Sequence, residues 1–505
     1  MLDRQAAPDH STLAALLWLP AADKALNGIP VLRRIRRAPG TIWALSSLSF
    51  FIDTFVYSLT VAMLPDVLQN SMGAPESANG IVTTMFGVGG FVGSLATGIL
   101  SDRLHDRRTL QMLGSLIYLV AGLVFYFAQH YYQILLFRLI NGIASGCAGA
   151  LLYASLGDVY PANLLGFKVA IVYFCNDIGY TIGPICGQKL YDAQGVKGPA
   201  SVVIALGIFK LLLLATAAED SLTIRKELFH REPIMDVSIA PTPQQSINEF
   251  DSVQVAAIPP LSEKAEILSL EKADGHSSVS YTTPIQPTAD RLPDAQVNLS
   301  LPRLLLRLPV IVATLSIVAS LGVQGMLEGL VPLHLIDSLN RPHDGGITFV
   351  ILGLVFIVTV PIVGRTIDML IEWRGERMRY FIFLFGSLAM ILAMVVMSVA
   401  HSYTVLMVGF ALFAVTNLCM CVPAQSAYGD FVNAIGTDSM ARGYSIAVCA
   451  WATGAMVLPP IGTALYSRYG FTVPVIAVPT IFCVISASAA MVFIVRDICL
   501  RKRHY

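Results

Sequence analysis

The stretch that decides the fold of this chain is DIGYTIGPICGQKLYDAQG, residues 177–195, inside a run that otherwise reads as membrane-spanning. A proline removes one helical hydrogen bond and bends the axis, and small residues let helix backbones approach closely. A near copy, GAMVLPPIGTALYSRYG, occupies residues 454–470. At identical spacing, the first copy's Gly179, Pro184, Gly187, Leu190, Tyr191 and Gly195 match Gly454, Pro459, Gly462, Leu465, Tyr466 and Gly470. The repeat predicts two related halves in parallel order.

The composition indicates a protein with many membrane-spanning segments. The chain has 505 residues, of which 55% are hydrophobic and 13% charged, and its mean hydropathy is +0.67. A soluble protein cannot hide that much apolar surface. The net charge of zero argues against a nucleic-acid partner. The eight cysteines lie mostly in apolar runs, so we interpret them as packing thiols and expect neither a metal nor a cofactor.

Twelve apolar segments, each about 20 residues long, are candidate membrane spans. They begin near residues 42, 81, 110, 132, 168, 199, 309, 347, 380, 403, 442 and 471. The predicted fold is an all-α membrane protein with 12 transmembrane helices in two pseudo-symmetric six-helix bundles, residues 41–218 and 305–496. The remaining parts are a cytosolic N-terminal segment (1–40), a disordered cytosolic linker with a short helix near 222–230 (219–304), and a cytosolic basic tail (497–505).

The placement of basic residues predicts the orientation of the chain. Arginine clusters precede the first span and follow the second, eighth and twelfth, whereas the loop PDVLQNSMGAPESANG, residues 65–80, has no basic residue. The positive-inside rule therefore places both termini and the linker in the cytosol. The N-terminus lacks a basic leader, and its apolar patch at 13–19 is too short to span, so we expect a cytosolic amphipathic segment.

Three motifs in order resemble the signatures of the major facilitator superfamily. GILSDRLHDRR, residues 98–108, looks like the loop between its second and third spans, although Leu-His-Asp stands where a glycine is usual. LLFRLINGIASG, residues 135–146, is similar to the signature of the fourth span. GYTIGPICG, residues 179–187, resembles the fifth-span signature of the antiporter branch. The resemblance covers nearly all of the chain outside its termini and linker.

Within that superfamily, the chain looks most like the drug:proton antiporter branch that includes the vesicular amine transporters. An aspartate in the middle of the first span with a proline downstream, Asp53 and Pro65, matches that group, as does Met-Leu-Glu before a proline in the seventh span, ending at Glu328. The tenth span, however, has Thr-Asn-Leu at 416–418 and no acid. A fungal-type efflux transporter of another organic compound therefore fits better than a monoamine carrier.

Six polar residues inside predicted spans are the candidates for substrate binding and proton coupling: Asp53, Arg138, Asn141, Asp177, Glu328 and Asn417. Uncompensated charges in lipid are costly, so we expect the three acids to face a central lumen and to exchange protons. The alternative is a structural pair with a basic or amide partner. The resemblance implies that Arg138 couples to proton movement or orders the cavity; the alternative is an arginine that reaches the outer interface.

The second group of candidates concerns conformational change. We expect Gly98, Asp102, Arg103, Arg107 and Arg108 to latch helix ends together in one conformation and release them in another, as do Gly364 and Asp368 at the equivalent place in the second half. We expect the bent helix with Gly179, Gly183, Pro184 and Gly187, and its counterpart with Pro459, to lie against a neighbour across the interface between the halves.

The sequence thus predicts a monomeric proton-coupled antiporter that moves a drug or secondary metabolite by alternating access, in the plasma membrane or a vacuolar or vesicular membrane. The alternatives are a vesicular-type amine transporter, a facilitator without protons, and a membrane sensor on the same scaffold. We expect no enzyme, because the chain has no Gly-x-Ser-x-Gly, no His-Glu-x-x-His and no Walker loop. The expected partners are a small organic substrate, protons and the lipid bilayer.

Overall fold

A computed structural model of the chain describes residues 26–104, 106–160, 162–217, 219–229, 308–341, 344–375, 377–435 and 440–502. Within those ranges the secondary structure is helical. Most of the predicted linker lies outside the described residues.

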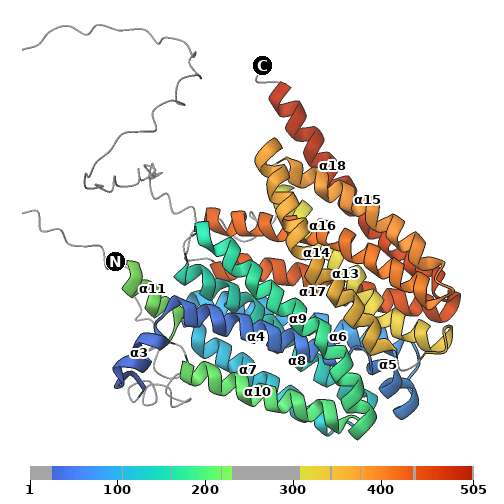
Figure 1. The fold of residues 1–505 in the computed structure, drawn as a ribbon, viewed down its shortest axis with the longest axis horizontal. Helices are drawn as coiled ribbons and strands as arrows, with labels where there is room; N and C mark the ends of the chain where they lie inside the picture. The colour runs from blue at the N-terminus through green and yellow to red at the C-terminus, as the bar shows by residue number, and fades with distance from the viewer. Residues whose placement is uncertain are drawn as a thin grey trace, which may run out of the picture. The chain divides into compact units, whose positions relative to one another are not determined.

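The first half, coloured blue to green in Figure 1, contains six helices of 20 residues or more and several shorter ones. The long helices are α4 (Pro39–Leu59), α6 (Ala78–Leu104), α7 (Arg107–Tyr126), α8 (Tyr131–Val159), α9 (Ala162–Gln194) and α10 (Lys197–Ala217). The short ones are α3 (Pro30–Arg36), α5 (Leu64–Asp66), the π-helix η1 (Val67–Ser71) and α11 (Ser221–Phe229). α7 begins at a side-chain cap, because Asp106 accepts a hydrogen bond of 3.0 Å from the backbone N–H of Thr109.

The second half, coloured yellow to red, contains six further long helices. They are α13 (Leu308–Asp337), α14 (Gly345–Arg374), α15 (Met378–Ser398), α16 (Tyr403–Ile435), α17 (Met440–Tyr469) and α18 (Thr472–Lys502). Their starts agree with the predicted spans within a few residues, so the predicted helices are confirmed. Helices satisfy every backbone N–H and C=O internally, which a segment in lipid requires.

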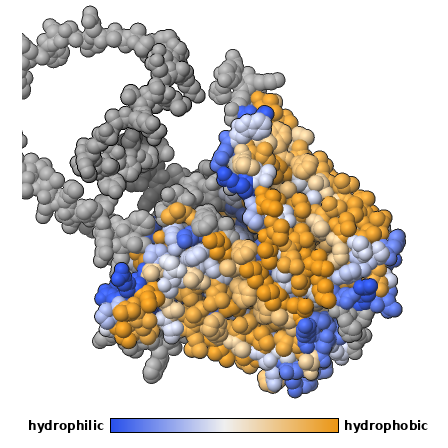
Figure 2. Space-filling view, viewed as in Figure 1, coloured by the Kyte–Doolittle hydropathy of each residue, from blue (hydrophilic) through white to orange (hydrophobic). Residues whose placement is uncertain are grey.

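Eleven of the described helices are long and apolar enough to cross a membrane. The twelfth long helix, α9, carries the polar and glycine-rich motif that opened the sequence analysis. Large apolar side chains such as Phe127, Phe385 and Leu392 are exposed on the outer faces. Figure 2 shows hydrophobic residues covering most of the visible face of the helices, with hydrophilic residues gathered at the helix ends. This is the surface of a protein surrounded by lipid.

Helix pairing in the first half recurs in the second. α4 packs on α9, α6 on α8, and α7 on both α8 and α10; six spans later, α13 packs on α17, α14 on α16, and α15 on both α16 and α18. Between the halves, α6 packs on α17 and α9 on α14. The same pairing in both halves agrees with the two related halves that the duplicated motif predicts.

The glycine face of α9 does not lie where the sequence analysis placed it. Gly179, Gly183 and Gly187 pack against α4 of their own half, not across the interface between the halves. A Cβ added to Gly179 would lie 2.5 Å from the carbonyl oxygen of Phe51. The helices are also joined by a hydrogen bond of 3.2 Å from the Ser58 hydroxyl to the carbonyl of Gly179. The prediction of close helix packing is confirmed, but the predicted partner helix was wrong.

The second copy of the motif packs in the equivalent way, with one exchange of size. Gly454 lies against Val318 and Gly322 of α13. Leu458, at the position equivalent to Gly183, is fully buried and contacts Gly322 of α13. In this half the glycine at the contact is therefore on the partner helix. Across the interface between halves, the contact comes instead from backbone near the prolines: Pro184 and Ile185 face Gly346, and Pro459 faces Gly80.

Gly183→Ala tests this packing. A Cβ at Gly183 would overlap the Ser58 hydroxyl and lie 2.7 Å from the carbonyl oxygen of Phe55. Because backbone cannot give way cheaply, we expect a loss of stability of about 1–3 kcal/mol, seen as a lower thermal midpoint in detergent. Gly364→Ala is the matched control, since nothing lies within 4 Å of the added Cβ. Equal midpoints for the two variants would contradict the packing described here.

Helices are also described outside the two predicted six-helix bundles. α3 lies within residues 1–40, α11 lies within the linker predicted to be disordered, and α18 runs into the predicted basic tail. The linker's first residue is already part of the fold, because Glu219 is buried and pairs with Arg37 at 2.6 Å. The short helix predicted near 222–230 is confirmed as α11.

Candidate functional site

A buried carboxylate joins the two halves. Glu328 on α13 is 5% exposed. It accepts a hydrogen bond from the Tyr57 hydroxyl of α4, and one of 2.8 Å from the Tyr180 hydroxyl of α9. Gln324, one turn earlier on α13, donates at 3.3 Å. A single second-half carboxylate thus holds two helices of the first half.

Two asparagines extend this network to further helices. The Asn417 amide of α16 donates to the Gln324 side-chain oxygen at 3.4 Å. Asn79 of α6 donates to the carbonyl of Gly329, next to the carboxylate, at 2.8 Å. Polar contacts therefore run without a break from α16 through α13 to α4, α6 and α9, and buried networks of this kind favour one arrangement of the helices.

Arg138 on α8 lies beside this network and is 2% exposed. Its guanidinium lies 5.5 Å from the ring centre of Tyr57, 5.8 Å from that of Phe86 and 5.9 Å from that of Phe137. The alternative that it reaches the outer interface is therefore wrong. Among the described residues, its Nε and Nη1 atoms have no hydrogen-bond partner.

Unpaired polar atoms accumulate around Arg138. Asn141, three residues later on the same helix, is 1% exposed, and neither its amide nitrogen nor its oxygen has a partner in the described part of the chain. The side-chain oxygen of Asn417 is also unpaired there. Buried polar groups nearly always find partners, and an orphaned group costs about 1–3 kcal/mol. The unpaired atoms of Arg138 and Asn141, one turn apart on α8, make this part of the protein a candidate binding position.

Aromatic rings close this centre on the side of α6 and α17. The rings of Tyr57 and Phe86 are 4.6 Å apart, and Phe86 meets Trp451 edge-on at 5.6 Å. Rings from both halves therefore cover the charged groups, and the low dielectric they create strengthens every electrostatic contact inside. We refer to Tyr57, Phe86, Arg138, Asn141, Tyr180, Gln324, Glu328, Asn417 and Trp451 as the central site.

Asp53 does not belong to the central site, contrary to the expectation that it faces the lumen. Its carboxylate forms an ion pair of 2.6 Å with Lys210 of α10, and the two side chains are only 8% and 4% exposed. The Lys210 ammonium also lies 5.6 Å from the ring centre of Tyr118, whose hydroxyl donates to the backbone carbonyl of Asp53 at 3.2 Å. The pair lies within the first half, which is the structural alternative the sequence left open.

Asp177 lies on α9 one turn before Tyr180 and is half-buried. Its carboxylate accepts a hydrogen bond of 3.4 Å from the neighbouring Asn176, whose side-chain oxygen accepts from Thr54 of α4. Through Asn176, the Asp177 carboxylate is therefore connected to α4, and its hydrogen bonds among the described residues do not reach the central site. Of the three predicted acids, Glu328 alone joins the halves.

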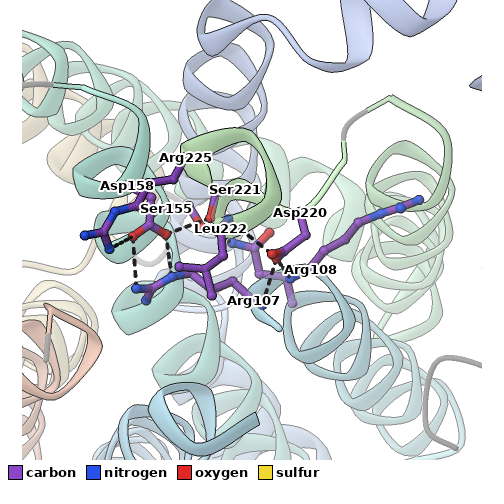
Figure 3. A network of polar contacts seen from close by, with 9 residues as sticks. Arg107, Arg108, Ser155, Asp158, Asp220, Ser221, Leu222 and Arg225 are labelled. Atoms are coloured by element: carbon purple, nitrogen blue, oxygen red, sulfur yellow. Dashed lines mark hydrogen bonds and ion pairs between the residues drawn. The ribbon is translucent and has the colours of Figure 1, made fainter. Parts of the chain in front are cut away.

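A second polar cluster surrounds the carboxylate of Asp158 at the end of α8 (Figure 3). Arg107 of α7 pairs with it at 2.5 Å, and the Ser221 hydroxyl of α11 donates to it at 2.8 Å. Arg225, one turn further on α11, approaches to 3.8 Å. The cluster fastens α11 to the end of the first half.

Two arginines of the predicted latch, Arg107 and Arg108, lie in or beside this cluster. Arg107 pairs with Asp158, and Arg108 donates to the carbonyls of Leu214 and Ala215 at the end of α10, at 3.0 and 2.5 Å. Both therefore hold helix ends of the first half together, and their release in another conformation stays a prediction. The side chains of Asp102 and Asp368 lie outside the described residues. For Gly98 and Arg103 the latch stays a prediction, and Gly364 faces open space.

Asp220 caps α7 from another segment, which gives a direct test of the cluster. Its carboxylate accepts hydrogen bonds of 2.9 and 3.0 Å from the backbone N–H groups of Arg107 and Arg108. We expect Asp220→Ala to cost about 1–2 kcal/mol and to loosen α11, measured as faster trypsin cleavage after Arg225. Glu372→Ala, at an exposed position of α14, is the control. Unchanged cleavage would show that Asp220 does not hold α11.

Several residues of the central site and of the Asp53 pair were not predicted from the sequence. Lys210 carried a usable signal, because it is the sole charged residue of the apolar run IALGIFKLLLLATA, residues 204–217. Tyr57, Tyr180 and Gln324 carried none that separates them from other polar residues of membrane helices. The role of all three comes from the Glu328 carboxylate, which is one turn from Gln324 on the same helix but 271 residues from Tyr57 and 148 from Tyr180.

Comparison with known proteins identifies the family to which this sequence is similar. The sequence profile described as the Major Facilitator Superfamily matches residues 46–441. An uncharacterized MFS-type transporter of Methanocaldococcus jannaschii is 25% identical over 173 residues, which is 34% of this chain and 45% of that protein. Another, of Schizosaccharomyces pombe, is 22% identical over 214 residues, 42% of this chain and 47% of that protein. The chain thus spans about half the length of these curated relatives.

The fold agrees with a solved structure. The crystal structure of the human organic anion transporter MFSD10 (TETRAN) superposes with a TM-score of 0.55 at 17% identity, covering 90% of this chain and 99% of that one. The profile match extends over most of the sequence and includes all three of the motifs discussed above. The chain therefore belongs to the Major Facilitator Superfamily, and it is a multi-pass membrane protein and not an enzyme.

Proposed function

We propose that this chain is a proton-coupled transporter of a small organic molecule, with Glu328 as the group that carries the proton. The observation that carries the proposal is the carboxylate of α13 held by Tyr57 of α4 and Tyr180 of α9, beside the buried guanidinium of Arg138. An ionisable group that joins two rocking halves couples its protonation to their separation.

The chemistry of the contact supports this coupling. An ionised carboxylate accepts hydrogen bonds from both tyrosine hydroxyls, whereas a protonated one must itself donate and has fewer acceptor sites. Proton binding to Glu328 therefore weakens its hold on α4 and α9, and proton release restores it. The same carboxylate then favours one arrangement of the halves when ionised and another when neutral.

The finer predictions from the sequence complete the proposal. Twelve spans, α9 included, form two pseudo-symmetric bundles that alternate access to the central site, and both termini lie in the cytosol. The recurrence of helix pairing supports the two-bundle arrangement, and the basic clusters support the orientation. The resemblance to the drug:proton antiporter branch implies antiport, in which a drug or metabolite and the proton move in opposite directions.

The test is flux in proteoliposomes that contain the full-length protein. With an imposed pH gradient, a panel of anionic, neutral and cationic organic solutes should include at least one that accumulates above the level of empty vesicles. A solute that binds and stabilises the protein, yet never moves in either direction, would point to a sensor instead. Flux that is indifferent to the pH gradient would point to a facilitator and would contradict the role of Glu328.

A further inference from the structure

The two charged groups of the central site differ in how many hydrogen-bond partners they have. The Glu328 carboxylate accepts three hydrogen bonds, from Tyr57, Tyr180 and Gln324. The Arg138 guanidinium, equally buried, makes contacts with rings but leaves Nε and Nη1 without an acceptor among the described residues. Among the described residues, the charged group of the central site that lacks hydrogen-bond partners is therefore the cation, and its N–H groups require an acceptor, while the unpaired oxygens of Asn141 and Asn417 are neutral.

The positions of the unpaired nitrogen atoms further limit the class of ligand. Nε and Nη1 belong to different forks of the planar guanidinium, so each fork keeps at least one unpaired nitrogen. Asn141, three residues later and one helical turn away, adds a second unpaired donor. An oxyanion with two or more oxygens, such as a carboxylate or a sulfonate, can accept from a guanidinium fork and an amide together, and the rings of Tyr57 and Phe86 suit an apolar or aromatic body.

We propose that the central site binds a small organic anion through Arg138 and Asn141, and that the anion is transported together with a proton on Glu328. This inference rests on the proposed function and names the class of its substrate. It replaces the antiport expected from the family resemblance by co-transport in the same direction.

The coupling follows from the charges. While Glu328 is ionised, it offsets the positive charge of Arg138, and the site as a whole attracts anions weakly. Protonation removes that offset and leaves a buried cation whose natural partner is an anion. An anion and a proton therefore favour each other's binding, and by linkage each raises the affinity for the other by the same factor. An organic cation would instead have to displace donors from a carboxylate that is already satisfied.

The binding test uses the full-length protein in nanodiscs and three probes of similar shape: benzenesulfonate, benzamide and benzylamine. Benzenesulfonate is chosen because it stays anionic at acidic pH. We expect it alone to raise the thermal midpoint, and to bind more tightly at mildly acidic than at neutral pH. Stabilisation by benzylamine alone, or by none of the three, would overturn the proposal.

Variants separate a ligand-binding arginine from a structural one. Arg138→Gln should weaken benzenesulfonate binding about 10- to 100-fold, the range for loss of a charge-assisted hydrogen bond. Asn141→Leu should weaken it less, and Arg138→Lys should restore part of it. Arg365→Gln, at an exposed position of α14, is the matched control. If Arg138→Gln fails to fold, Asn141→Leu provides the test. An unchanged affinity of Asn141→Leu for benzenesulfonate would show that the anion does not bind at this site.

Proton movement distinguishes this inference from the proposed function. An inward gradient of benzenesulfonate, which carries no proton through the bilayer by itself, should acidify proteoliposomes that contain the transporter. Alkalinisation would mean exchange and would overturn co-transport while leaving proton coupling intact. Proton movement driven by benzylamine alone would likewise retain the proposed function and refute the anion. If no solute class moves protons, both proposals fall.

Discussion

Asp53→Asn is expected to destabilise the protein by about 3–5 kcal/mol, the range measured when one partner of a buried ion pair is removed. The variant leaves the Lys210 ammonium, 4% exposed, without the carboxylate that lies 2.6 Å from it. The neutral amide cannot offset the charge, and the rest of the site offers the lysine mainly the ring of Tyr118. The measurement is the thermal midpoint in detergent, together with unfolding in SDS.

A second replacement in the same protein shows whether the charge is responsible. Asp53→Asn combined with Lys210→Met removes both charges, and we expect it to recover most of the lost stability, because a buried pair can be replaced by neutral groups at little cost. Lys210→Met alone should be as damaging as Asp53→Asn. A stable Asp53→Asn single variant that has lost all proton-driven transport would instead favour the proton-coupling role that the sequence predicted for Asp53.

Glu328→Gln is expected to abolish accumulation driven by a pH gradient while leaving exchange of substrate across the membrane measurable. Glutamine has nearly the same shape and is neutral at every pH, so it imitates the protonated state permanently. Its side-chain oxygen can still accept from Tyr57 or Tyr180, and the fold should survive with a midpoint close to that of the parent protein. The site would bind substrate without the pH dependence of the parent.

The matched control for that variant is Glu372→Gln, which removes a carboxylate from an exposed position of α14. Its accumulation should equal that of the parent protein. Tyr180→Phe is the intermediate case, since it removes one donor of 2.8 Å and should shift the pH dependence without abolishing transport. Undiminished gradient-driven accumulation by Glu328→Gln would show that another group carries the proton.

Some features of this protein are readable from the order of its residues because they are local. A backbone in lipid must satisfy its own polar groups, so each apolar run of sufficient length becomes a helix, and all twelve predicted helices were found. The glycines of residues 179–187 predicted close helix packing because they leave the helix face without side chains. Their copy at 454–470 predicted a duplicated fold because it repeats the same spacing. Each follows from composition and spacing within one segment.

The partners of those segments were decided by the tertiary structure alone. A smooth face built from Gly179, Gly183 and Gly187 fits either neighbour of α9, and only the assembled bundle puts it on α4. A buried charge demands compensation without saying where it comes from: Asp53 takes Lys210, 157 residues away, whereas Glu328 takes two tyrosines of the other half. Hydropathy and motif spacing act along the chain, while electrostatic and steric fit act across space, so only the folded helices could separate the structural acid from the one that joins the halves.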